Sequence, residues 1–242
     1  MDPNVLGGLL AIIGGLLAPQ LLARKPVLGP RWLALPAFGV VLACLVLTFS
    51  RGAIAALGLA LVGLALFPRY RSMLLLIAAG AFVILVLPAM RSYVTHFVEG
   101  VQGQDLATQM RFGEYKDALI LIGRYPWRGV GFSGAPEIDI YLGVSSAYLS
   151  LTEEMGLAGL AVFLLIMVIV FAWAFRTWRR AYRDEALTPL WLGAHAGLAA
   201  ALVVGVVDHY FFNLDFQPAG TLFWIFVGLC LAATRLASAL GN

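Results

Sequence analysis

Residues 157–175, LAGLAVFLLIMVIVFAWAF, contain no charged side chain and are followed at once by the basic run RTWRR at 176–180. A helix that crosses the hydrocarbon core of a bilayer needs about 20 mostly apolar residues, because every backbone polar group must be hydrogen-bonded within the segment. This stretch therefore predicts a membrane-spanning helix. The fold class depends on how often the same pattern recurs.

Other stretches of the chain have the same character. The seven predicted spans are residues 5–23, 32–49, 53–67, 73–90, 157–175, 189–207 and 219–237. The third is short, but Arg51 and Arg69 flank it and can extend their charged heads toward the two interfaces. We expect an all-α polytopic membrane helix bundle of about seven spans, a single membrane domain over 1–242 with one external loop that carries an amphipathic helix.

The composition agrees with a membrane protein and excludes a soluble globular one. Of the 242 residues, 62% are hydrophobic and 12% are charged, against roughly 45–50% and about 25% in soluble domains. A net charge of +3 in so apolar a chain does not suggest nucleic-acid binding. Cys44 and Cys230 lie far apart in apolar runs, so neither a disulfide framework nor a thiolate metal site is expected. We expect no metal and no cofactor.

Lysine and arginine are unevenly divided between alternate loops. One set of loops carries Arg24, Lys25, Arg31, Arg69, Arg71, Arg176, Arg179, Arg180, Arg183 and Arg235. The other carries Arg51, Arg91, Arg111, Lys116, Arg124 and Arg128, all but the first of them in one long loop. Because cytoplasmic loops keep the excess of cations, we expect the N-terminus and the segment 91–155 outside and the C-terminus in the cytoplasm. An external start without a signal peptide suggests the C-terminal part of a longer chain.

The external segment contains a helical pattern over 106–123. The apolar residues that recur at helical spacing are Phe112, Tyr115, Leu119 and Ile122. Glu114 and Asp117 are expected on the opposite, solvated face. The pattern predicts an amphipathic helix that lies on the membrane or on the bundle.

A shaped loop follows at 124–134, RYPWRGVGFSG, with one proline and three glycines. Arg124 and Arg128, beside aromatic rings, could seat an anionic lipid headgroup or a glycan, and an interfacial aromatic belt with snorkelling arginines explains them equally well. Glu153 and Glu154 lie close to the fifth predicted span, where the helix dipole favours carboxylates, so capping accounts for them without chemistry.

Several short motifs occur in a fixed order along the chain. They are Ser50-Arg51-Gly52-Ala53, Arg111, Pro126 with Gly129-Val130-Gly131-Phe132, Tyr148-Leu149 and Glu154-Met155-Gly156-Leu157-Ala158-Gly159-Leu160. This order resembles the O-antigen ligase and polymerase superfamily, whose members transfer glycans from a polyprenyl-diphosphate carrier to an acceptor outside the bacterial cytoplasmic membrane. The resemblance covers nearly all of this chain but only the C-terminal part of a family member.

The resemblance implies a metal-independent glycan ligase or polymerase of the bacterial inner membrane, with a lipid-linked glycan and an acceptor as partners. Stabilising a departing diphosphate suits arginine, which binds it bidentately. By analogy with the family, Arg51 and Arg111 are the first candidates for the diphosphate, and Arg124 and Arg128 the second.

The family's ligases carry a histidine just ahead of the Tyr-Leu pair as the base that accepts the acceptor's proton. Here Ser145 and Ser146 stand in its place. His96 and His195 are expected to be structural, His195 as a hydrogen-bonded core residue. The remaining candidates for the base are His209, Asp139, Glu153 and Glu154, and Asp208 beside His209 could raise its basicity.

Two alternatives stay open at this point. The missing histidine is compatible with a non-catalytic member or with a transporter of small, bicarbonate-like anions, which should place cations along a path at the bilayer midplane. His195 is the one ionisable residue clearly within a predicted span, which argues mildly against transport. The length also suggests that a partner chain or a homodimer completes the bundle.

Overall fold

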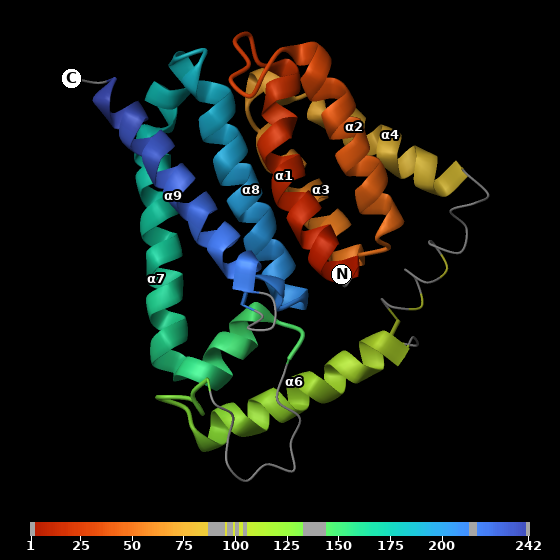
Figure 1. Ribbon diagram of the computed structural model, residues 1–242, viewed down its shortest axis with the longest axis vertical. Helices are drawn as coiled ribbons and strands as arrows, with labels where there is room; N and C mark the ends of the chain where they lie inside the picture. The colour runs from red at the N-terminus through yellow and green to blue at the C-terminus, as the bar shows by residue number, and fades with distance from the viewer. Residues whose placement is uncertain are drawn as a thin grey trace.

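The computed structural model describes residues 3–86, 95, 99, 102–103, 106–132, 144–212 and 217–240, and every regular element within them is helical (Figure 1). The α-helices are α1 (Pro3–Leu22), α2 (Arg31–Leu47), α3 (Arg51–Ala65), α4 (Met73–Val86), α6 (Leu106–Arg124), α7 (Ala147–Arg183), α8 (Leu187–Val207) and α9 (Gln217–Ala239). Two 3-10 turns are η1 (Pro68–Tyr70) and η3 (Tyr210–Phe212). The fold is all-α, as the sequence predicted.

A helix lies over each of the seven predicted spans, but the number seven is not confirmed. Among the described residues, four helices are both long and apolar enough to cross a membrane: α1, α7, α8 and α9. Helices α2 and α3 are apolar but have 17 and 15 residues, about 26 and 22 Å at 1.5 Å per residue. The predicted span 73–90 runs past α4 into residues outside the described ones.

Helices α1 and α8 form the centre of the bundle and make the most extensive helix–helix contact among the described elements. Glycine allows their backbones to touch. A Cβ on Gly15 would lie 2.8 Å from the backbone of Gly197, and a Cβ on Gly193 would lie 2.5 Å from the carbonyl oxygen of Leu16. Small residues drive helix association in membranes in this way, because lipid tails are as apolar as the side chains.

The other helices pack around this pair. Helices α2 and α3 lie against α1, α3 also contacts α8, and α7 and α9 lie against the other side of α8 (Figure 1). The core has two parts. One, around Phe38, Leu57 and Trp191, fills the α1/α2/α3/α8 side, and the other, around Phe163, Phe211 and Phe223, fills the α7/α8/α9 side.

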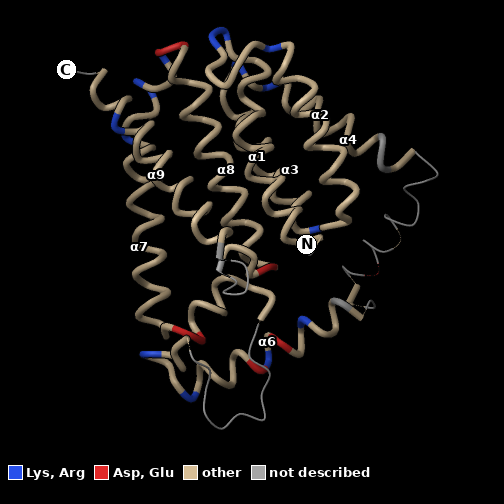
Figure 2. Tube along the Cα trace, in the orientation of Figure 1, with Lys and Arg blue, Asp and Glu red and all other residues tan. Residues whose placement is uncertain are grey.

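The charged residues gather at the two ends of the bundle (Figure 2). Lysines and arginines gather at the end where α1 and α3 finish and α8 begins, which we call the basic end. There the exposed ion pair between Arg24 and Glu185, 2.7 Å, links the α1–α2 and α7–α8 connections. Helix α6 crosses the opposite end, which we call the α6 end, where α1 and α3 begin and α8 finishes (Figure 1).

Helix α7 is broken near its start. Gly156 has φ 72° and ψ −179°, outside helical geometry, so α7 consists of a segment 147–155 and a long apolar segment that begins at residue 157. The sequence placed the start of the helix at 157, whereas the chain is already helical from Ala147. The short first segment lies at the α6 end, and the long one runs along the bundle to the basic end (Figure 1).

Candidate functional site

The α6 end of the bundle joins the start of α3 to the end of α8. Ser50 precedes α3 and is buried against α1, since a Cβ on Gly7 would lie 2.7 Å from the Ser50 Cβ. A Cβ on Gly52 would lie 2.6 Å from Cγ2 of Val207. The glycine of the Ser-Arg-Gly motif thus lets α3 approach α8 closely, which places Arg51 beside the end of α8.

Helix α6 is attached to this end by hydrogen bonds to the backbone of Ser145. Glu114 Oε2 accepts a hydrogen bond from the backbone N–H of Ser145, 2.9 Å, and the Tyr115 hydroxyl donates to the carbonyl oxygen of the same residue, 3.1 Å. Two residues later, the N–H of Ala147 donates to the carbonyl oxygen of Asp208, 3.1 Å. These bonds connect α6, the start of α7 and the end of α8 in one continuous network.

Arg111 lies close to this network and acts on it through its charge. It lies one turn before Tyr115 on α6, and its positive charge opposes the increase that burial causes in the pKa of the Tyr115 hydroxyl. The carboxylates of Glu114 and Asp208 act on that hydroxyl in the opposite sense. Within the described part of the chain, Arg111 makes no ion pair with a carboxylate. The structure therefore brings Arg51, Arg111 and residue 208 to the same end of the bundle.

His209 follows directly after α8 at this end. Its Nδ1 atom is buried and has no hydrogen-bond partner among the described residues. Asp208 Oδ1 accepts a hydrogen bond from the N–H of Tyr210, 2.9 Å, an Asx-type turn that leads into η3. Tyr210 is itself buried against α1, where a Cβ on Gly8 would lie 2.6 Å from its ring.

Glu153 is the most deeply buried acidic side chain among the described residues, with 4% of its surface exposed. Burial, together with the negative charges of Glu154, Asp117 and Glu114, raises the pKa of its carboxyl to about 7. Burial also raises the pKa of Glu154, and a hydrogen bond from Ser150 opposes that increase. Glu153 thus lies beside α6, in a group of carboxylates that share its environment.

The capping explanation for Glu153 and Glu154 is wrong. Both lie in the last turn of the segment 147–155, ahead of the break at Gly156, and not at the start of a helix. Their carbonyl oxygens, which an unbroken helix would use internally, accept hydrogen bonds from the loop after α6 instead.

That loop is fastened to the break in α7 by three backbone hydrogen bonds, which together we call the clasp. The N–H of Val130 donates to Glu153 O, 2.7 Å, the N–H of Gly131 to Glu154 O, 2.9 Å, and the N–H of Leu157 to Pro126 O, 2.7 Å. A Cβ on Gly129 would overlap the carbonyl of Glu153, and one on Gly156 the carbonyl of Trp127. Both glycines also have positive φ.

The structure separates Arg124 and Arg128 from Arg51. Arg124 ends α6, Arg128 lies within the loop of the clasp, and both are exposed. Neither makes an ion pair with any described residue. Arg128 lies in the loop that binds the backbone of Glu153, whereas Arg51 and His209 lie where α3 begins and α8 ends. Glu114 interacts with both regions, since it accepts a hydrogen bond from Ser145 and its charge raises the pKa of Glu153.

The predicted faces of the external helix are partly wrong. Phe112 and Leu119 are 60% and 61% exposed, whereas Glu114 is partly buried against Ser145. From residue 111 onward, the residues of α6 that are buried or partly buried are Arg111, Glu114, Tyr115, Asp117, Ala118, Leu121 and Ile122. Because α6 packs on a chain turn that offers backbone N–H and C=O groups, its hydrogen-bonding side chains turn inward along with the small apolar ones.

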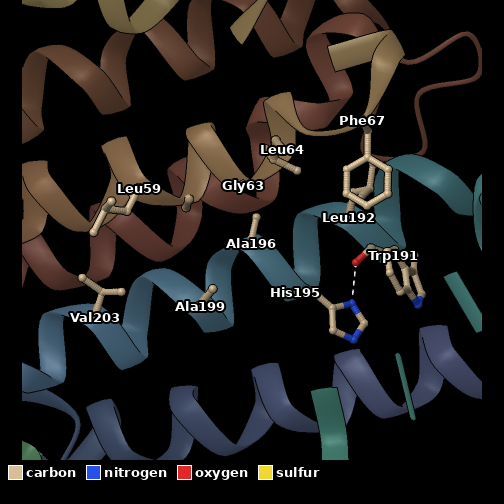
Figure 3. A pocket seen from close by; sticks show the side chains of 11 residues that line it. Leu59, Gly63, Leu64, Phe67, Trp191, Leu192, His195, Ala196, Ala199 and Val203 are labelled. Carbon is tan, nitrogen blue, oxygen red and sulfur yellow. Dashed lines mark hydrogen bonds between the residues drawn. The ribbon is translucent and has the colours of Figure 1, made fainter. Parts of the chain in front are cut away.

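His195 is a hydrogen-bonded core histidine, as predicted. Its Nδ1 lies 2.6 Å from the carbonyl oxygen of Trp191 (Figure 3). Its Nε2 lies 3.4 Å from the Thr234 hydroxyl. It borders an apolar pocket of about 240 Å³ between α3 and α8. The lining runs from Leu59 on α3 to Phe67 just after it, and from Trp191 to Val203 on α8. None of the predicted site residues lines this pocket. His96 and Asp139 lie outside the described residues.

Sequence reasoning missed Glu114, Tyr115 and Asp117 as part of the site. A signal was present, since Arg111, Glu114 and Tyr115 recur at i, i+3 and i+4, the spacing of one helix face. Among the described residues, no group of three or more His, Cys, Asp or Glu side chains could hold a metal ion.

Comparison with known proteins supports one family. A search of the curated proteins gave no match. The family model described as O-antigen ligase matches residues 36–164, just over half of the chain. The matched region includes the Ser-Arg-Gly motif, α6, the clasp and the break in α7, and it ends before His209. The chain therefore belongs to the O-antigen ligase family.

Proposed function

We propose that this protein transfers a glycan from a polyprenyl-diphosphate carrier to an acceptor hydroxyl at the outer face of the bacterial inner membrane, without a metal ion. One observation carries the proposal. Helix α6 binds the turn between Ser145 and Ala147, and this turn binds the end of α8, so cations and carboxylates meet at one end of an apolar bundle.

The proposed reaction needs residues of two kinds, arginines that bind the diphosphate and a base that accepts a proton. Arg51 and Arg111 bind the diphosphate and stabilise the negative charge that grows on it. The acceptor oxygen attacks the anomeric carbon as the bond from that carbon to the diphosphate oxygen breaks, with inversion. Polyprenyl diphosphate leaves with the bonding electrons, and the acceptor's proton passes to a base of the enzyme.

Glu153 is our first candidate for the base. A carboxyl with a pKa of about 7 is ionised in part at neutral pH and is a much stronger base than an ordinary glutamate. His209 is the second candidate, because its buried Nδ1 has no partner among the described residues. A base of either kind would take the place of the histidine that Ser145 and Ser146 replace.

The test uses the protein reconstituted in vesicles with a polyprenyl-diphosphate oligosaccharide as donor and a glycolipid as acceptor. Product glycan and released polyprenyl diphosphate are measured together. We expect Arg51→Ala and Arg111→Ala each to lower the rate by about 100-fold or more, the effect of removing a donor that stabilises a developing negative charge.

Two matched variants serve as controls. Lys116→Ala removes an exposed cation from the same helix as Arg111, and Arg71→Ala removes an exposed cation at the basic end. Both should retain near wild-type rates. Full activity of the Arg51 and Arg111 variants would contradict the proposal, and so would bicarbonate flux that depends on Arg51 in vesicles that transfer no glycan.

A further inference from the structure

The loop of the clasp exposes a group of aromatic side chains beside the break in α7. Trp127 is 72% exposed, Phe132 62% and Tyr125 50%, and the exposed Arg124 and Arg128 lie among them. Neither catalysis nor the packing of the bundle uses these rings.

The clasp fixes the position of this loop relative to α7. Hydrogen bonds run from Pro126, Val130 and Gly131 to residues on both sides of Gly156. The backbone of Trp127 touches Gly156 so closely that no Cβ fits between them. Wherever residue 156 lies along the membrane normal, Trp127 must therefore lie at nearly the same depth.

The apolar segment after the break shows where residue 156 lies. Between Gly156 and Arg176 there are nineteen residues without a charge, about 28 Å of helix at 1.5 Å per residue, which matches a hydrocarbon core of about 30 Å. The large side chains that this segment exposes are Leu157, Val162, Leu164, Leu165, Val168, Ile169 and Phe175. They extend over the whole length, so the lipid-facing surface begins immediately beside the clasp.

From this geometry we infer that the loop 124–132 is seated in the interface of the bilayer, with Tyr125, Trp127 and Phe132 at headgroup depth. The occupant of this aromatic surface is the lipid, because the surface continues directly into the lipid-facing side of α7. Amphipathic rings prefer this depth, and the two arginines beside them suit anionic headgroups. The clasp then holds Glu153 at the same depth.

Spin labels measure this depth directly. Trp127→Cys, Phe132→Cys and Val168→Cys are labelled in a Cys44→Ser, Cys230→Ala background and reconstituted in phosphatidylcholine vesicles, with and without phosphatidylglycerol. Collisions with oxygen and with a water-soluble nickel complex are compared with those of lipids labelled at the headgroup and along the acyl chain. We expect positions 127 and 132 to match the headgroup and upper acyl standards, and position 168, midway along the span, to be several-fold more accessible to oxygen.

A second measurement leaves both cysteines in place. Lipids brominated near the carbonyl end of the acyl chain should quench a component of the tryptophan fluorescence that Trp127→Tyr abolishes, and lipids brominated near the methyl end should quench that component less. Labels at 127 and 132 in bulk water, or protected only after a glycan is added, would overturn the inference. Neither readout requires glycan transfer. The inference about the depth of the loop therefore fails or holds independently of the proposed enzyme activity.

Discussion

At the scale of single residues, Glu153 shows how a position in the fold changes an ordinary carboxyl. Its sequence neighbours suggest a helix cap, but burial beside Asp117 and Glu114 opposes its ionisation and raises its pKa to about 7 from 4.5. The folded protein therefore holds a proton that the unfolded chain releases between these two pKa values. Stability should decrease as the pH rises from about 4.5 to 7.

This predicts a pH effect on unfolding. Glu153→Gln removes the titration, so the fall in the thermal midpoint between pH 5 and 8 should be smaller in the variant than in the wild type. The full shift corresponds to a free-energy difference on the order of 3 kcal/mol. Thermal unfolding in detergent across this range is the measurement.

The control for this experiment is Glu185→Gln. Glu185 lies at the basic end, and its pKa is lowered by the hydrogen bond from Arg24, so it is already ionised throughout the range tested. That variant should keep the wild-type pH dependence. An unchanged slope in Glu153→Gln would mean that this carboxyl titrates normally.

At the scale of elements, the clasp depends on glycines that no other residue can replace. Gly156→Ala places a Cβ against the backbone of Trp127 at a φ that L-residues avoid, and should cost about 2 kcal/mol or more of stability. Gly113→Ala, on α6 with open space around its Cβ, is the matched control and should stabilise by up to about 1 kcal/mol. Thermal midpoints of the two variants should move in opposite directions.

The crossing of α1 and α8 also requires glycine, although its glycines have ordinary helical dihedral angles. A Cβ on Gly15 meets the backbone of Gly197, so Gly15→Ala must push the helices apart and should cost about 1–3 kcal/mol. Gly58→Ala on α3 meets nothing within 4 Å and should be neutral or slightly stabilising. Equal midpoints for these two variants would show that the helices can separate freely.

The sequence predicted well where these helices begin and end, and predicted poorly which of their residues contact other segments. Apolar runs placed the ends of α1, α8 and α9 within about two residues, because the bilayer requirement acts on each helix alone. The inner face of α6 and the start of α7 depend on contacts with distant segments, such as Ser145 and Pro126. Of the site, Arg51 and Arg111 were chosen from motifs, and Glu153 was chosen as a candidate base in place of the missing histidine. The spacing of Arg111, Glu114 and Tyr115 indicates a shared helix face, but only the packed structure shows that this face points inward.

At the scale of the whole molecule, the separation of charge predicts the orientation. The basic end carries most of the loop cations and should face the cytoplasm, which places α6 outside. A single cysteine in place of Lys116 tests on which side of the membrane the α6 end lies, and one in place of Arg71 tests the basic end. A membrane-impermeant maleimide added to intact spheroplasts should label the Lys116→Cys protein and leave the Arg71→Cys protein unlabelled until the membrane is broken.

The α1–α8 contact has a consequence for biosynthesis. The ribosome finishes α1 more than 160 residues before it starts α8, so the glycine-rich surface of α1 remains among lipids or beside the insertion machinery while the five described α-helices between them emerge. In the orientation predicted above, α6 is translocated in the meantime, and it cannot complete its anchorage until Asp208 has followed α8 through the membrane. In the function that we propose, the acceptor and donor sites of a nascent chain therefore form together, in the final stage of insertion, and a protein arrested before that point has neither.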